Sequence, residues 1–348
     1  MKIPISIVHT LPEQQWRDFV DKHPHGNIFH TPEMFEVFRQ TRNHVPEIWA
    51  AVSGDQVIAL LLPVRIHLLA GLLRPLTTRA IAYGSPLYIQ DQEGRDGLEK
   101  LLNGYRDSIK NSALFIELRN SNDTNDIQPI LERCKYSFED HLNYLVNTDL
   151  PADQVMNNIH SSVKKKITKA LSKNQFEIIE IHEEAQIKSV VSILKKTYSN
   201  AHIPLADSSL FESAFKILYP KNMIRILVGR ADGHDIAASV SLLYKDVIHG
   251  WYRGFDREFA AYLPNDLMVW DSLKWGSEHA YHIFDFGGAG KPDEEYGPRK
   301  FKAKFGGKLV NYGRNISVYS PRFLQVSKWG YELFRHLSLK KVLGEKHG

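Results

Sequence analysis

The chain has 348 residues, 43% of them hydrophobic, which is enough material for two domains of about 150 to 180 residues. Its formal charge of +4 permits anionic partners without demanding nucleic acid. The single cysteine, Cys134, excludes an internal disulfide framework and any multi-cysteine metal site, so a reducing, cytoplasmic setting is expected.

The N-terminal residues lack the basic leader and apolar core of a signal peptide, so export is not expected. The longest apolar run, residues 57–73, is interrupted by Pro63, Arg65 and His67. It is too short and too polar to span a bilayer and predicts a strand, a turn and a strand.

The first half of the chain reads as a hairpin followed by a strand, a helix and a strand. Residues 48–52 and 57–62 flank the turn Ser53-Gly54-Asp55 and predict the hairpin. A strand over 81–89, a helix over 93–110 and a strand over 114–118 follow.

The second half repeats this order about 170 to 180 residues later. Residues 224–228 and 236–240 predict a hairpin, and residues 247–255, 265–279 and 283–286 predict a strand, a helix and a strand. Such a repeat indicates a duplicated domain of the mixed-sheet α/β class. We expect one domain over 1–140 and a second over 141–320.

Two basic segments lie outside this repeat. A helix is expected from Pro151 to about Ser172, and residues 160–173 hold five lysines and no acid, with Lys164 and Lys166 as candidate phosphate ligands. A solvated helix face is the alternative. Residues 321–348 predict a basic amphipathic helix that packs back on the first domain or contacts a membrane surface.

Candidate binding residues gather at the ends of the second set of strands. Tyr252 and Arg253 end one strand, and Tyr262 and Asn265 precede the next helix, a favoured ligand position in α/β units. The alternative is that the tyrosines are amphipathic residues at the edge of the core.

The glycines of residues 285–290 precede Lys302 and Lys304, a combination that suits an anion held close to the backbone. A strand-end turn beside a solvated basic loop is the alternative here.

Several catalytic classes are not supported. There is no Gly-x-Ser-x-Gly elbow, no dinucleotide-binding glycine spacing and no P-loop. His23 with His25, and His279 with His282, lack a cluster of further ligands, so no metal and no permanently bound cofactor are expected.

Several segments of the chain together match a known family. These segments are Phe29 to Phe35, Ser162 to Ala170 before Phe176-Glu177-Ile178, Gly250 to Gly254 with Tyr262 to Asn265, Phe284 to Gly288, and Phe301 to Phe305. They resemble the FemABX family of peptidyltransferases, whose fold is a tandem version of the GNAT acetyltransferase fold. The resemblance implies two tandem GNAT-like domains with mixed, mostly antiparallel sheets.

The resemblance implies direct acyl or aminoacyl transfer to an amine of an anionic cell-wall or polysaccharide precursor. The family's Phe-Lys pair matches Phe301 and Lys302, which implies that Lys302 stabilises the tetrahedral intermediate or leaving group while Phe301 shapes the wall beside it. Arg39, four residues after Phe35, matches a phosphate-binding position of the family.

The donor implied is aminoacyl-tRNA or acyl-coenzyme A, and charged tRNA is a possible partner. The acetyltransferase pyrophosphate signature is missing before Asn265, which weakens the case for coenzyme A. The alternative function is a non-catalytic module that uses a basic cleft to bind an anionic glycan or RNA.

Overall fold

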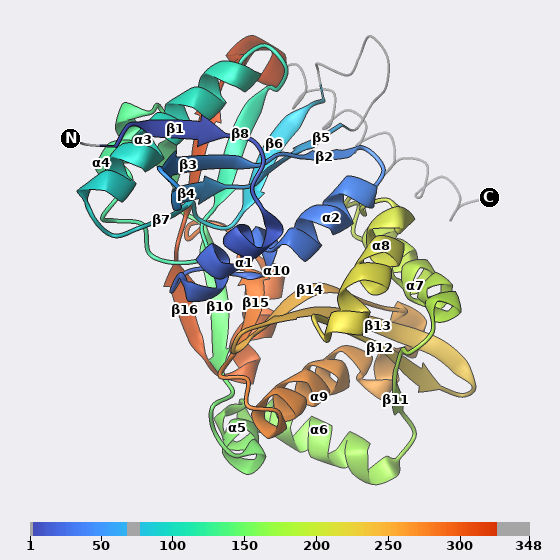
Figure 1. Ribbon diagram of the computed structural model, residues 1–348. Coiled ribbons are helices and arrows are strands. Elements are labelled where there is room, and N and C mark those ends of the chain that lie inside the picture. The colour runs from blue at the N-terminus through green and yellow to red at the C-terminus, as the bar shows by residue number, and fades with distance from the viewer. Residues whose placement is uncertain (1–2, 68–76, 326–348) are drawn as a thin grey trace. The chain divides into compact units, whose positions relative to one another are not determined.

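The computed structural model describes residues 3–67 and 77–325, which divide into two compact units (Figure 1). Unit 2 is Asp140–Asn311, and unit 1 contains the residues before and after it. The expected second domain runs to residue 320, whereas residues 312–318 lie in unit 1 because strand β17 (Arg314–Val318) pairs with β8 (Phe115–Arg119) and β9 (Ser137–Glu139) of that unit. Beyond residue 325, the helix expected over 321–348 lies outside the described residues.

Unit 1 contains two sheets. Within the described residues their strand orders are β2-β5-β6-β8-β17-β9 and β1-β3-β4-β7. The remaining strands are β1 (Ile5–Val8), β2 (His44–Pro46), β3 (Trp49–Ser53), β4 (Gln56–Leu61), β5 (Pro63–Ile66), β6 (Arg79–Tyr83) and β7 (Leu87–Tyr88). The helices are α1 (Glu13–Lys22), α2 (Pro32–Gln40), α3 (Gln92–Ile109) and α4 (Gln128–Arg133).

Helix α3 organises the core of unit 1. Leu98, Leu101, Leu102 and Tyr105 recur at helical spacing, so they share one face, and all four are buried. This face packs against β3 and β4. The strand after the helix, β8, then pairs in parallel with β6, which precedes the helix and is followed by the short strand β7.

Unit 2 is built on one sheet, whose strand order in the described residues is β11-β12-β13-β14-β15-β10-β16. The strands are β10 (Leu142–Asn147), β11 (Glu177–Glu180), β12 (Ile224–Ala231), β13 (His234–Tyr244), β14 (Val247–Phe255), β15 (Ile283–Gly288) and β16 (Lys308–Asn311). The helices are α5 (Ala152–Asn158), α6 (Ser161–Lys173), α7 (Ile187–Asn200), α8 (Ser208–Leu218), α9 (Pro264–Glu278) and α10 (Gly297–Lys302).

Helices cover both faces of this sheet. Helices α5, α6 and α9 pack together on one face, and α7 and α8 lie on the other (Figure 1). Strands β14 and β15 are parallel and are joined through α9, as β6 and β8 are joined through α3. The predicted fold class is therefore confirmed, with mixed and mostly antiparallel sheets in both units.

The helix expected from residue 151 to 172 is interrupted. Ile159 and His160 adopt extended backbone angles, ending α5 and starting α6. The His160 side chain accepts a hydrogen bond from the amide of Ser162, and its own amide donates to the Lys304 carbonyl at 2.8 Å. These two bonds satisfy backbone and side-chain groups at the break, as an N-cap does.

None of the helices in residues 3–67 and 77–325 combines the length and the apolar content needed to cross a membrane.

Candidate active site

Strands β14 and β15 separate soon after they pair. Their parallel register joins Val247–His249 to Ile283–Asp285, after which β14 continues to Phe255 beside β13 alone. Val240 and Ser241 of β13 pair with Tyr252 and Gly250, so Trp251 is the extra residue of a β-bulge. The bulge redirects the β14 side chains. After His249, the side of β14 that faces β15 is no longer paired with it, and we call the region between residues 250–255 and the end of β15 the wedge.

Lys302, the last residue of α10, binds the end of β15 through its side chain. Its Nζ donates to the main-chain carbonyls of Phe286 at 2.8 Å, Gly287 at 3.3 Å and Gly288 at 2.7 Å. An ammonium has three N–H donors, so these three carbonyls, the three-carbonyl site, engage all of them. Burial, reinforced by the charge of Arg253, lowers the pKa of Lys302 to about 8, so the amine titrates close to neutrality.

A second cation, Arg253, lies near Lys302, and both contact the aromatic ring of Phe286. The Arg253 guanidinium is 5.5 Å from the centroid of the Phe286 ring, and Lys302 Nζ is 5.9 Å from it. Burial lowers the pKa of Arg253 to about 10, and within the described part of the chain its buried Nε has no hydrogen-bond partner. Two partly buried cations with a spare donor create a site that favours an anion.

Asp285 is an acidic group whose charge acts on Lys302, and it is already engaged. Its Oδ1 accepts from the Gly287 amide at 2.7 Å, and its Oδ2 lies 3.2 Å from His249 Nδ1. Burial alone would raise the pKa of Asp285, but these bonds and the charge of Lys302 lower it overall. Gly287 has a φ of +68°, which glycine adopts without strain. Asp285 therefore stabilises the turn.

Tyr198, which the sequence does not mark, lies near Arg253 and Tyr296. Tyr198, near the end of α7, has its ring 5.9 Å from that of Tyr252. Burial raises the pKa of Tyr198 to about 12, opposed by Arg253 and reinforced by Tyr296, the residue before α10. No sequence pattern marks Tyr198, because its role depends on α7 packing against β14.

The structure brings Tyr252, Arg253 and Lys302 to the wedge. Phe301 packs into the core of unit 2, with its ring 5.1 Å from that of Phe305. Tyr262 donates its hydroxyl to Asp232, in the turn between β12 and β13. Asn265 lies in the first turn of α9 and is partly buried.

The remaining predicted residues belong to other elements. Arg39 is on α2 of unit 1, where its Nη2 is 2.8 Å from Glu36 Oε1. Lys164 donates to Asn157 and is partly buried, whereas Lys166 and Lys304 are exposed. Burial raises the pKa of Asp266 on α9. The positive charges of Lys166 and Lys304 oppose this effect, so both lysines lie near that carboxyl group.

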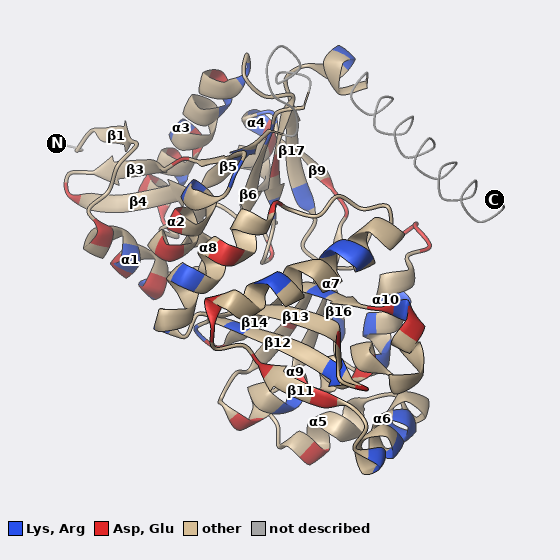
Figure 2. Cartoon of the chain, turned by 90° about the vertical axis from the view of Figure 1, so that its right-hand side faces the viewer, with Lys and Arg blue, Asp and Glu red and all other residues tan. Residues whose placement is uncertain are grey.

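Most lysines of α6 face solvent. Lys165, Lys166, Lys169 and Lys173 are exposed, and Figure 2 shows them as basic segments along this helix. Among the described residues, no group of three or more His, Cys, Asp or Glu side chains could hold a metal ion.

Comparison with known proteins bears on the fold that carries these residues. Residues 158–298 match the family model described as an acetyltransferase (GNAT) domain. No curated protein matches the sequence.

Solved structures extend the likeness to the whole chain. A crystal structure of FemX has a TM-score of 0.70 at 15% identity, covering 92% of this chain and 99% of that one. L-PGS from Bacillus licheniformis has a TM-score of 0.57 at 11% identity, covering 94% and 97%. A tandem GNAT protein from the clavulanic acid biosynthesis pathway has a TM-score of 0.56 at 10% identity, covering 91% and 99%.

The FemABX resemblance is thus confirmed at the level of the fold. The acetyltransferase domain matched by residues 158–298 supports a transferase.

Proposed function

We propose that this FemABX-like transferase moves an aminoacyl or acyl group from an ester or thioester donor to an amine of a cell-wall or surface-polysaccharide precursor in the cytoplasm. The observation that carries the proposal is the wedge, where the cations of Lys302 and Arg253 share the ring of Phe286. Strand ends of this kind are common ligand positions in α/β sheets.

The proposed step needs no covalent enzyme intermediate. The neutral amine attacks the donor carbonyl, a C–N bond forms, and the C–O or C–S bond of the donor breaks. The attacking nitrogen loses a proton and the leaving oxygen or sulfur gains one. Negative charge develops on the carbonyl oxygen between these events, and a preorganised cation stabilises it best.

The two cations have different roles in this proposal. Arg253 offers a donor that has no partner in the described residues, so it contacts the developing oxyanion or a donor phosphate. Lys302 holds the end of β15 through the three-carbonyl site and adds its charge to the wedge. Phe301 fixes the end of α10 by packing against Phe305.

The donor in the proposal is anionic, either an aminoacyl-tRNA or an acyl-coenzyme A. The exposed lysines of α6 support this choice, because none of their flanking helix residues is acidic. An anionic donor held partly by such exposed charges should bind more weakly as salt is added.

The test is transfer activity of the whole protein. Purified protein is incubated with charged tRNA or an acyl-coenzyme A and a pool of precursor amines, and new amides are sought by mass spectrometry. Lys302→Met should lower the rate by roughly 10²-fold, because it removes both the charge that Lys302 adds to the wedge and the bonds that hold the end of β15. Lys300→Met is the matched control, because Lys300 lies on the same helix and is exposed beside Glu295.

Near-normal turnover of Lys302→Met would remove Lys302 from the mechanism. The alternative, a non-catalytic module for an anionic glycan or RNA, is favoured by one observation: backbone carbonyls already engage all three donors of Lys302. Absence of product with every donor, together with salt-sensitive binding of a polyanion, would support that module.

A further inference from the structure

The chain passes from one sheet of unit 1 to the other at Gly84. Strand β6 ends at Tyr83 in the first sheet, and β7 begins at Leu87 beside β4 in the second. Gly84 has a φ of +139°, and a Cβ there would lie 2.7 Å from Cε1 of His30, so the turn requires glycine.

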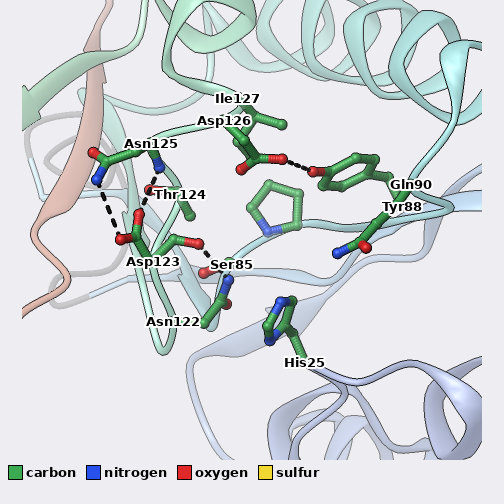
Figure 3. Close-up of a pocket in the computed structure, with 11 residues that line it drawn as sticks. His25, Ser85, Tyr88, Gln90, Asn122, Asp123, Thr124, Asn125, Asp126 and Ile127 are labelled. Carbon is green, nitrogen blue, oxygen red and sulfur yellow. Dashed lines mark hydrogen bonds between the residues drawn. The ribbon is translucent and has the colours of Figure 1, made fainter.

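A pocket lies where this turn meets the loop after β8. Strands β6 and β8 are parallel, so the loops that follow them share one edge of the sheet. The pocket has a volume of about 330 Å³, within the range of small-ligand sites. Its lining comes from the turn after β6, residues 122–127 after β8, and His25 and Gln90 (Figure 3).

The pocket lining is acidic and contains neither lysine nor arginine. Asp126 accepts from the Tyr88 hydroxyl, and Arg95 pairs with it: Nη1 donates to the Asp126 main-chain carbonyl at 2.9 Å, and Nη2 lies 3.4 Å from Oδ2 of its carboxylate. Asp123 is exposed and accepts from the Asn125 amide at 2.8 Å and from its side chain at 3.2 Å. A phosphate would meet the exposed Asp123 carboxylate here, so an anionic ligand is disfavoured.

The lining also carries an unsatisfied acceptor. The Asn122 side chain lines the pocket, and its Oδ1 is buried without a hydrogen-bond partner in the part of the chain that the structure describes (Figure 3). A buried polar atom in this state costs free energy, which a ligand donor would recover once the Asn122 side chain turns its oxygen toward the pocket. Pro86 and Ile127 add apolar surface to the same pocket.

We propose that this pocket of unit 1 binds a sugar unit that is neutral or carries an amine. A hexose or hexosamine brings several O–H and N–H donors for the Asn122 carbonyl and the free lone pairs of Asp123 and Asp126. Its C–H groups suit the apolar part of the lining. The pocket would act independently of the transfer reaction, so it can be tested without an active donor.

The test measures binding to the whole protein by calorimetry and by saturation-transfer NMR. The probes are N-acetylglucosamine, glucosamine and glucose 6-phosphate. Both uncharged and amine-bearing sugars should bind with Kd values on the order of millimolar, as expected for ligands of their size. Glucose 6-phosphate should bind at least tenfold more weakly, because its phosphate faces the Asp123 carboxylate.

Variants assign the binding to this pocket. Asp123→Asn should weaken glucosamine binding by about tenfold, the loss expected for a hydrogen bond to a charged acceptor. Asn122→Ala should weaken N-acetylglucosamine binding, and it provides a second test if Asp123→Asn folds poorly. Asp55→Asn, in the exposed turn between β3 and β4, is the matched control and should change neither affinity.

Absence of binding by both sugars would overturn the proposal. Equal binding of glucose 6-phosphate, or equal losses in Asp123→Asn and Asp55→Asn, would also overturn it.

Discussion

Replacement of Lys302 by Met should change how stability depends on pH. Burial lowers the pKa of Lys302 from 10.5 to about 8, and this drop corresponds to about 3 kcal/mol. The native pKa lies below the unfolded one, so between pH 8 and 10.5 the unfolded chain holds a proton that the native protein has released. The free energy of unfolding of the wild type therefore rises with pH across this window, by up to about 1.4 kcal/mol per pH unit.

The Lys302→Met variant lacks this gain. The stability of the wild type relative to the variant should increase by about 3 kcal/mol between pH 7 and pH 11, because other groups titrate in both proteins and cancel. Urea unfolding at fixed pH, followed by tryptophan fluorescence, measures this, since Trp251, Trp270 and Trp275 lie in unit 2.

Lys300→Met, at an exposed position, should change stability little at any pH. A difference between wild type and Lys302→Met that stays constant from pH 7 to pH 11 would refute the reasoning.

Three further outcomes are expected. Gly84→Ala should destabilise unit 1 by roughly 2 to 4 kcal/mol in denaturant unfolding, because its Cβ would lie 2.7 Å from His30. Gly54→Ala, whose Cβ would lie 3.8 Å from its nearest neighbour, should cost about 1 kcal/mol. Equal losses in the two variants would contradict the steric argument. Arg253→Met should lower kcat/KM by roughly 10²-fold and weaken inhibition by inorganic pyrophosphate, and unchanged inhibition would argue against an anion at Arg253. Asp285 has a lowered pKa, so its carboxylate contributes stability that is present above pH 3.8 and lost on acidification below it. Asp285→Asn should therefore be less stable than the wild type at pH 7, but it should lose less stability than the wild type between pH 5 and pH 3. Denaturant unfolding at each pH measures both differences.

Local patterns of the sequence predict most of the fold. The helices expected over 93–110 and 265–279 appear as Gln92–Ile109 and Pro264–Glu278, because their apolar stripes and flanking strands are local signals. The helix break at Ile159 and His160 was missed because it depends on the carbonyl of Lys304, far away in the sequence. Residues 312–318 were assigned to the wrong unit for the same kind of reason, since a strand's partner is not encoded beside it.

The candidate site was only partly predictable. Lys302 and Arg253 could be singled out because basic residues near glycines and strand ends suit anions. Their shared contact with Phe286 depends on where β14 and β15 separate, which no spacing in the sequence reveals. The acidic pocket of unit 1 combines a turn, a loop and His25, three segments that only the folded chain brings together.

The position of β17 has a consequence for the order of folding during synthesis. This strand lies between β8 and β9 in its sheet, yet its residues are made after the whole of Asp140–Asn311. The N-terminal part leaves the ribosome first but must wait for a strand encoded about 175 residues after β9. Its sheet therefore depends on contacts of long sequence separation, which close slowly. The later-made unit, continuous in sequence, can complete its own sheet before the earlier one does.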